Sequence, residues 1–182
     1  MKATGIVRRI DDLGRVVVPK EIRRTLRIRE GDTLEIFTDR EGEIILKKYS
    51  PIGELSAFAG QYAEALAQNT GHTVCITDRD QVIAVAGGGK KELYGKTISR
   101  QLDEAINGRM SLTASREDSQ FVKIIDGDME GVESESISPI LCEGDAIGSV
   151  VLLNKEARTR MGEVEQKLTA TAAEFLGKQM ES

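Results

Sequence analysis

Nine lysine and arginine side chains lie within the first 29 residues of this chain, and they are the groups whose type and spacing most clearly predict a chemistry. They are Lys2, Arg8, Arg9, Arg15, Lys20, Arg23, Arg24, Arg27 and Arg29. Only Asp11, Asp12 and Glu21 oppose them, so this stretch carries a net charge of +6, whereas the whole chain carries −5. Guanidinium and ammonium groups bind phosphate oxygens. The pattern predicts an amino-terminal end that binds a polyanion which the rest of the chain repels.

Groups suited to catalysis are few. His72 is the single histidine and follows Gly71, which favours a structural place at a helix end. Cys75 and Cys142 lie far apart without CxxC spacing, so neither a disulfide framework nor a Cys-type zinc site is supported. We predict no catalytic residue, no metal and no cofactor. An activated thiolate remains the enzymatic alternative, for which Cys142 beside a turn is a better candidate than Cys75 inside a strand.

The composition limits the class of protein further. No Trp, three Tyr and four Phe are too few aromatic rings to favour a surface that stacks single-stranded bases. An apolar fraction of 40% supports a buried core. The sequence has no signal-peptide h-region and no apolar run of about 18 residues, so we expect a cytoplasmic protein without a membrane partner.

The basic groups must be positioned by a small amino-terminal module. Residues 5–11 and 15–18 are predicted as strands around a turn at Gly14, and Pro19 is predicted to open a helix over 20–26. Two further strands are predicted at 33–37 and 43–47. About 50 residues bury too little surface to be stable alone, and no cysteine or metal cluster stabilises them. We therefore expect an obligate dimer in which two chains share one hydrophobic core.

The remaining sequence predicts an α+β domain with one sheet. Ser50-Pro51 marks the boundary, and apolar residues at helical spacing predict helices over 52–68 and 161–180. The predicted strands lie at 73–77, 82–86, 110–114, 120–126, 134–141 and 146–153, with a helix near 97–107. We expect both long helices to pack on one face of the sheet and to pair with a second copy. The predicted parts are residues 1–50, the connecting helix 51–70, and residues 71–182.

The amino-terminal module resembles the AbrB family of bacterial transition-state regulators. The resemblance is carried by residues 4–8 (TGIVR), 13–17 (LGRVV), 21–26 (EIRRTL) and 44–49 (IILKKY), together with Pro19 and the turn at 31–32. It implies a swapped-hairpin β-barrel formed by two chains. It also implies DNA contacts from Arg8, Arg15, Arg23 and Arg24, to which Lys2 and Arg9 add positive charge.

Double-stranded DNA read by its shape is the expected partner. Residues 1–50 contain neither Asn nor Gln, the side chains that pair with adenine edges. Recognition is therefore expected to depend on deformable, AT-rich DNA, which also agrees with the family resemblance.

The carboxy-terminal part resembles a GAF domain, a fold that binds small ligands. The resemblance rests on the order of elements and on residues 72–78 (HTVCITD), 138–140 (SPI) and 144–151 (GDAIGSVV). It implies a ligand site near residues 87–91, 96–100 and 114–130, for a small ligand that the sequence does not identify. An AbrB-like head joined to a GAF-like tail resembles the transcription regulators of spore-forming bacteria.

We therefore predict a homo-oligomeric DNA-binding transcription regulator, an activator or repressor of sporulation genes at the bacterial nucleoid. Its head would form a dimer and its tail helices a tetramer. A GAF-type free methionine sulfoxide reductase and an AbrB-like antitoxin are the alternatives, and a tail that serves only for oligomerisation is a third.

Overall fold

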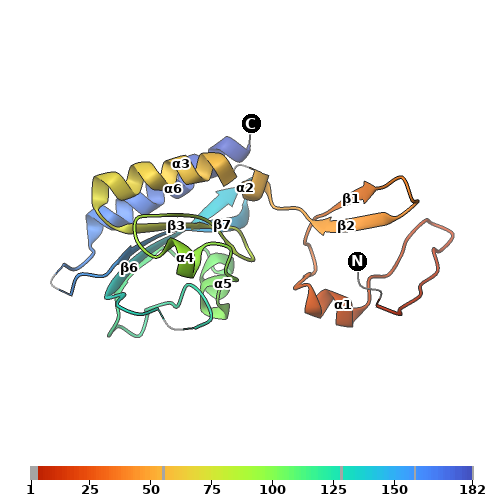
Figure 1. Ribbon diagram of the computed structural model, residues 1–182, viewed down its shortest axis with the longest axis horizontal. Coiled ribbons are helices and arrows are strands. Elements are labelled where there is room, and N and C mark those ends of the chain that lie inside the picture. The colour runs from red at the N-terminus through yellow and green to blue at the C-terminus, as the bar shows by residue number, and fades with distance from the viewer. Residues whose placement is uncertain (1–3, 55, 128, 158, 182) are drawn as a thin grey trace. The chain divides into compact units, whose positions relative to one another are not determined.

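The computed structural model describes residues 4–54, 56–127, 129–157 and 159–181, and the chain divides into two compact units, Met1–Tyr49 and Ser50–Ser182. The helices are α1 (Lys20–Thr25), α2 (Pro51–Glu54), α3 (Ser56–Thr70), α4 (Lys90–Leu93), α5 (Arg100–Asn107) and α6 (Glu163–Met180). The strands are β1 (Leu34–Thr38), β2 (Ile44–Lys48), β3 (Thr73–Thr77), β4 (Val82–Ala86), β5 (Leu112–Ser115), β6 (Ser134–Cys142) and β7 (Asp145–Asn154). Figure 1 shows these elements along the chain.

The two strands predicted at 5–11 and 15–18 are not present in the single chain. These segments flank the predicted turn, where the Asp11 N–H donates to the Arg15 carbonyl at 3.1 Å and Gly14 takes a φ of 76°. A strand requires ladder hydrogen bonds to a neighbour, and neither segment finds one among the described residues of this chain. Pro19 precedes α1 as its N-cap, and Leu26, predicted as the last helical residue, is the C-cap.

The β1–β2 hairpin exposes an apolar face. Ile36 pairs with Leu46 and Thr38 with Ile44, so Ile36, Ile44 and Leu46 lie on the same side of the hairpin. Ile36 is 67% exposed and Ile44 is 68% exposed. Both strands begin one residue later than predicted.

The described residues of unit 1, from residue 4 onward, form no apolar core of their own. Among the residues that the structure describes, twelve large hydrophobic side chains of this unit are exposed, against five in the much longer unit 2. They are Ile6, Val7, Ile10, Leu13, Val16, Val17, Leu26, Ile36, Phe37, Ile44, Leu46 and Tyr49. Both apolar clusters formed by described residues lie in unit 2. At about 25 cal/mol for each Å² of apolar surface, this exposure favours burial against another surface.

Unit 2 contains a five-stranded antiparallel sheet with the order β4-β3-β7-β6-β5. Helices α3 and α6 cover one face, as predicted (Figure 1). Ala59 and Ala63 of α3 and Ala172 and Leu176 of α6 join the apolar cluster on this face. The Phe175 ring lies 5.5 Å from that of Tyr62 and 6.0 Å from that of Phe58, which joins the two helices to each other.

The second apolar cluster includes side chains from the opposite phase of the strands, such as Cys75 and Val151, together with Leu102 and Ile106 of α5. The strand predicted at 120–126 is absent from the described chain, and only Ile125 forms an isolated bridge, with Ile98. The reason is that the backbone of this segment bonds mainly to side chains. Lys123 N–H donates to the Gln101 side chain at 3.0 Å, and Ile124 N–H donates to Met129 Sδ at 3.1 Å.

Two helical glycines give a matched test of how closely α6 packs on the sheet. A Cβ at Gly177 would overlap the carbonyl group of Leu141, whereas a Cβ at Gly60 in α3 would meet nothing within 4 Å. We expect Gly177→Ala to destabilise the protein by about 1–3 kcal/mol through overpacking. Gly60→Ala is expected to stabilise it by about 0.5–1 kcal/mol, because alanine is the better helix former. Thermal denaturation of both variants measures the difference, and equal melting temperatures would contradict the packing.

Candidate functional site

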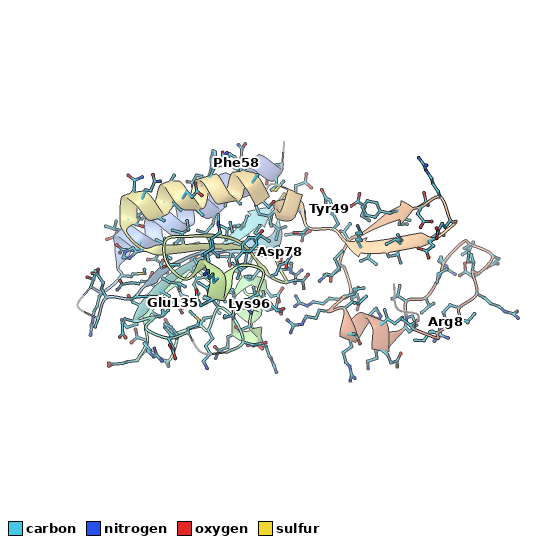
Figure 2. The ribbon with its side chains drawn as sticks, viewed as in Figure 1. Arg8, Tyr49, Phe58, Asp78, Lys96 and Glu135 are labelled. Atoms are coloured by element: carbon cyan, nitrogen blue, oxygen red, sulfur yellow. The ribbon has the colours of Figure 1, made fainter. Side chains whose placement is uncertain are left out.

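The predicted polyanion-binding side chains lie on two neighbouring parts of unit 1. Arg8 and Arg9 precede the Asp11–Arg15 turn and Arg15 closes it, while Arg23 and Arg24 lie on α1. Arg8, Arg9, Arg15 and Arg24 are exposed, and Arg23 is half-buried. Figure 2 shows Arg8 on the loop of unit 1 that contains the turn. Lys2 lies outside the described residues.

Asp11 holds Arg15 in place. Its carboxylate accepts the Arg15 backbone N–H at 2.7 Å, the Arg15 Nε–H at 2.8 Å and the Leu13 N–H at 3.0 Å. The backbone bond from Arg15 is the largest cause that lowers the pKa of Asp11, followed by the side-chain bond from Arg15. A lowered pKa keeps the carboxylate ionised, so this clamp is lost only when the pH falls through the lowered value. It is therefore intact at neutral pH.

The Arg23 side chain is also positioned by a backbone group. Its Nε–H donates to the Val18 carbonyl at 3.2 Å, which ties the guanidinium to the residues before α1. A guanidinium has five N–H donors, so this single bond orients the group and leaves donors for a phosphate. Arg24, the next residue, is exposed. Unit 1 thus presents an oriented guanidinium beside an exposed one, an arrangement suited to binding a phosphate backbone.

Part of the region predicted to hold a small ligand is filled by the protein's own side chains. Val122, Ile124 and Met129 belong to the second apolar cluster, so part of segment 114–130 is buried core. In the predicted glycine loop, a Cβ at Gly87 would lie 2.9 Å from the His72 carbonyl oxygen. The close approach of the two backbones explains why a glycine occupies this position.

Glu135 is a buried acid that the sequence analysis missed. It lies on β6 (Figure 2) and is 0% exposed, and Val122 N–H donates to its Oε1 at 2.5 Å. Burial raises its pKa to about 8, an effect that the bond from Val122 partly offsets. The alternation in residues 134–138 contained the signal, because Glu135 is in phase with Ile137 rather than with the serines on the other face.

The two thiols are not activated. Burial raises the pKa of Cys75 to about 12. Burial also raises the pKa of Cys142, and the charges of Glu181, Glu143 and Asp145 raise it further. A thiolate is the reactive form of cysteine, so both environments disfavour thiol chemistry.

A groove of about 360 Å³ lies away from the predicted ligand region. Ser138, Pro139 and Leu141 of β6 line it together with Ala173 and Lys178 of α6.

No helix formed by residues 4–54, 56–127, 129–157 and 159–181 is long and apolar enough to cross a membrane.

Comparisons with known proteins first identify relatives of unit 1. Transition state regulatory protein AbrB of Bacillus subtilis (strain 168) is 67% identical over 51 residues, which cover 28% of this chain and 52% of that protein. Residues 7–54 also match the family described as antidote-toxin recognition MazE, bacterial antitoxin. Unit 1 is an AbrB-type domain.

Solved structures place the fold of unit 2. A type II free methionine-R-sulfoxide reductase from Thermoplasma acidophilum superimposes with a TM-score of 0.57 at 10% identity, over 71% of this chain and 94% of that one. The second GAF domain of DevS from Mycobacterium smegmatis does so with a TM-score of 0.53 at 13% identity, over 69% and 93%. Unit 2 has a GAF-type fold. The protein is thus of the class that joins an AbrB-type head to a GAF-type domain.

The particular family follows from matches along the chain. Residues 54–181 match the family described as stage V sporulation protein T C-terminal, transcription factor. Stage V sporulation protein T of Bacillus subtilis (strain 168) is 57% identical over 181 residues, which cover 100% of this chain and 99% of that protein. The chain belongs to the stage V sporulation protein T family.

Proposed function

We propose that this protein is a DNA-binding transcription regulator of sporulation genes, which acts at the nucleoid in the bacterial cytoplasm. The observation that carries the proposal is an AbrB-type head whose arginines are exposed or oriented, within a chain that matches a sporulation transcription factor over its whole length. The GAF-type domain assembles the heads and senses a small ligand. Activation and repression are both compatible with this role.

The head acts as a dimer in this proposal. Two chains complete a swapped-hairpin barrel, in which the exposed apolar side chains of unit 1 form the shared core. Each of Arg8, Arg9, Arg15, Arg23 and Arg24 then occurs twice around a two-fold axis, which matches the pseudo-symmetry of duplex DNA. Lys2 adds charge at the same end of the chain.

AT-rich duplexes are the proposed targets. A head without Asn or Gln is expected to read deformability more than base edges. Competition between AT-rich and GC-rich duplexes of equal length, followed by fluorescence anisotropy, tests this preference. Equal affinity for both would leave DNA binding intact but remove the proposed preference.

The tail helices support a tetramer. Phe175 on α6 is 40% exposed and Val164 is 66% exposed, although α3 and α6 already cover the sheet. A second pair of these helices would bury such side chains. Joining two head dimers would raise DNA affinity through effective concentration. Light scattering on the full-length protein gives the assembly state.

The antitoxin and reductase alternatives are less well supported. The antitoxin family matches only residues 7–54, whereas the sporulation protein matches along the whole chain. The reductase and unit 2 share a fold at 10% identity. A likeness at this identity concerns the fold and carries no information about activity.

A thiol titration distinguishes a regulator from a thiol reductase. Because both thiol pKa values are raised, we expect Cys142 to react with a disulfide reagent at pH 7.5 more slowly than free cysteine. Cys75 is expected to react only after denaturation, since it is fully buried. A thiol in the native protein that reacts faster than free cysteine would reopen the enzymatic alternative.

Alanine substitutions at the adjacent residues Asp11 and Asp12 test whether Asp11 helps or hinders DNA binding. Asp11→Ala removes a negative charge but also releases Arg15, so we expect AT-rich duplex affinity to fall about fivefold, the worth of one hydrogen bond. Asp12→Ala removes the same charge from an exposed neighbour and is expected to raise affinity slightly. If both variants bind DNA more tightly, Asp11 only repels phosphate and does not position Arg15.

A further inference from the structure

We propose that Glu135 is the anchor of a ligand site in the GAF-type domain, and that the ligand is a small organic cation, a protonated amine or guanidinium on an apolar body. The inference rests on the proposed sensing function of this domain and names the chemical class of its ligand. It follows from an unpartnered buried oxygen, from the residues that surround it, and from the segment that covers it.

The carboxyl group of Glu135 is only half satisfied. Val122 N–H donates to Oε1, whereas Oε2 is buried and has no hydrogen-bond partner within the described residues. No described lysine or arginine forms a salt bridge with Glu135. Burying a carboxyl oxygen without a hydrogen-bond partner destabilises the fold. A buried group retained at this cost is characteristic of a binding site rather than of a packing position.

The surroundings of Glu135 are apolar. Leu153 of β7 and Ala114 of β5 lie opposite it in the sheet, and Ile137 is two residues further along on the same face. Leu153 and Ile137 belong to the second apolar cluster. A ligand here must offer a hydrogen-bond donor to Oε2 and apolar surface to these neighbours. A cationic ligand is favoured because it can pair with the carboxylate once Glu135 ionises, whereas an anionic ligand would oppose that ionisation.

An irregular segment covers the site. The covering segment, residues 121–127, forms no strand with the sheet. Val122, Ile124 and Ile125 pack in the second apolar cluster, and separate hydrogen bonds hold the backbone between them. Val122 N–H bonds to Glu135 itself, Lys123 N–H bonds to Gln101, and the Ser99 hydroxyl donates to the Lys123 carbonyl. A local shift of Val122 would therefore release Oε1 without breaking a ladder hydrogen bond of the sheet. A cation that takes the place of the Val122 N–H would couple ligand binding to the position of the segment.

Calorimetric titration of the full-length protein tests the proposal. The probes are phenethylamine and agmatine, each beside a neutral control, phenethyl alcohol or butanol. We expect at least one cation to bind and its neutral control not to bind. Glu135→Gln, which keeps an acceptor for Val122 N–H, is expected to weaken cation binding about tenfold or more. Glu133→Gln makes the same substitution at a half-buried neighbour and should leave binding unchanged.

A second measurement does not depend on the variants folding. Below pH 8 the free protein holds Glu135 largely protonated, so binding a cation should release close to one proton. Titration at pH 6.5 in buffers of different ionisation enthalpy measures this number. Failure of both amines to bind, binding without proton release, or equal loss in the Glu133 variant would each overturn the proposal. DNA binding by the same preparations is read separately, so its loss would count against the proposed function and not against the ligand class alone.

Discussion

Replacing Arg23 and Arg24 together by alanine is expected to weaken binding to an AT-rich duplex by about 100-fold or more at low salt. A dimer loses four guanidinium groups, and the slope of log affinity against log salt should fall by about four if each contacts a phosphate. Arg23 is oriented by the Val18 carbonyl and Arg24 is exposed next to it. Neither lies in an apolar cluster, so the fold should be retained. Fluorescence anisotropy and circular dichroism measure the two properties.

The matched control removes two cations from unit 2. Lys96 and Arg100 are both exposed, and changing both to alanine alters the net charge of the chain by the same amount. This control is expected to bind DNA as the parent protein does. If both double variants lose affinity equally, the loss reflects total charge and the head is not the binding site.

Ile36→Glu is expected to abolish the dimer and, with it, specific DNA binding. At a truly solvent-exposed position such a change would alter stability by only about 0.5 kcal/mol. In a shared core the unpaired carboxylate would cost about 3–5 kcal/mol in each subunit, which a core of this size cannot withstand. Analytical ultracentrifugation of residues 1–50 would then show monomers. That fragment is chosen because the proposed assembly through the GAF-type domain would hold full-length chains together even without the head dimer.

Tyr94→Glu in the full-length protein is the control for this second prediction. Tyr94 is 56% exposed in unit 2 and belongs to neither apolar cluster. It is expected to leave melting temperature and DNA binding nearly unchanged. Full-length Ile36→Glu should lose DNA binding while keeping the melting transition of unit 2. If it binds DNA normally, the hairpin face of Ile36 is not part of a shared core.

The local spacing of apolar residues was sufficient to predict most helices and strands of unit 2. Residues 73–77 and 82–86 form strands as predicted, because short apolar runs bounded by turn residues leave few alternatives. The helix predicted at 97–107 begins later, at Arg100, since the Ser99 side chain caps it. Both long helices pack on the predicted face, as their apolar stripes require.

Errors arose where structure depends on distant partners. Residues 5–11 and 15–18 have strand-like composition, yet a single chain offers them no ladder. Residues 120–126 alternate suitably, but side chains far along the sequence satisfy their backbone. Glu135 was missed for a related reason, because its burial depends on a segment that folds over it from outside the sheet.

Salt dependence of DNA binding by the full-length protein tests the central claim most directly. An anisotropy titration of an AT-rich duplex is expected to show affinity falling about 10³-fold or more between about 50 and 200 mM salt, since the arginines of two heads displace counterions. The slope should flatten in the Arg23→Ala, Arg24→Ala variant. Affinity that is absent, or that is indifferent to both salt and these arginines, would contradict the account of the head as a DNA-binding dimer.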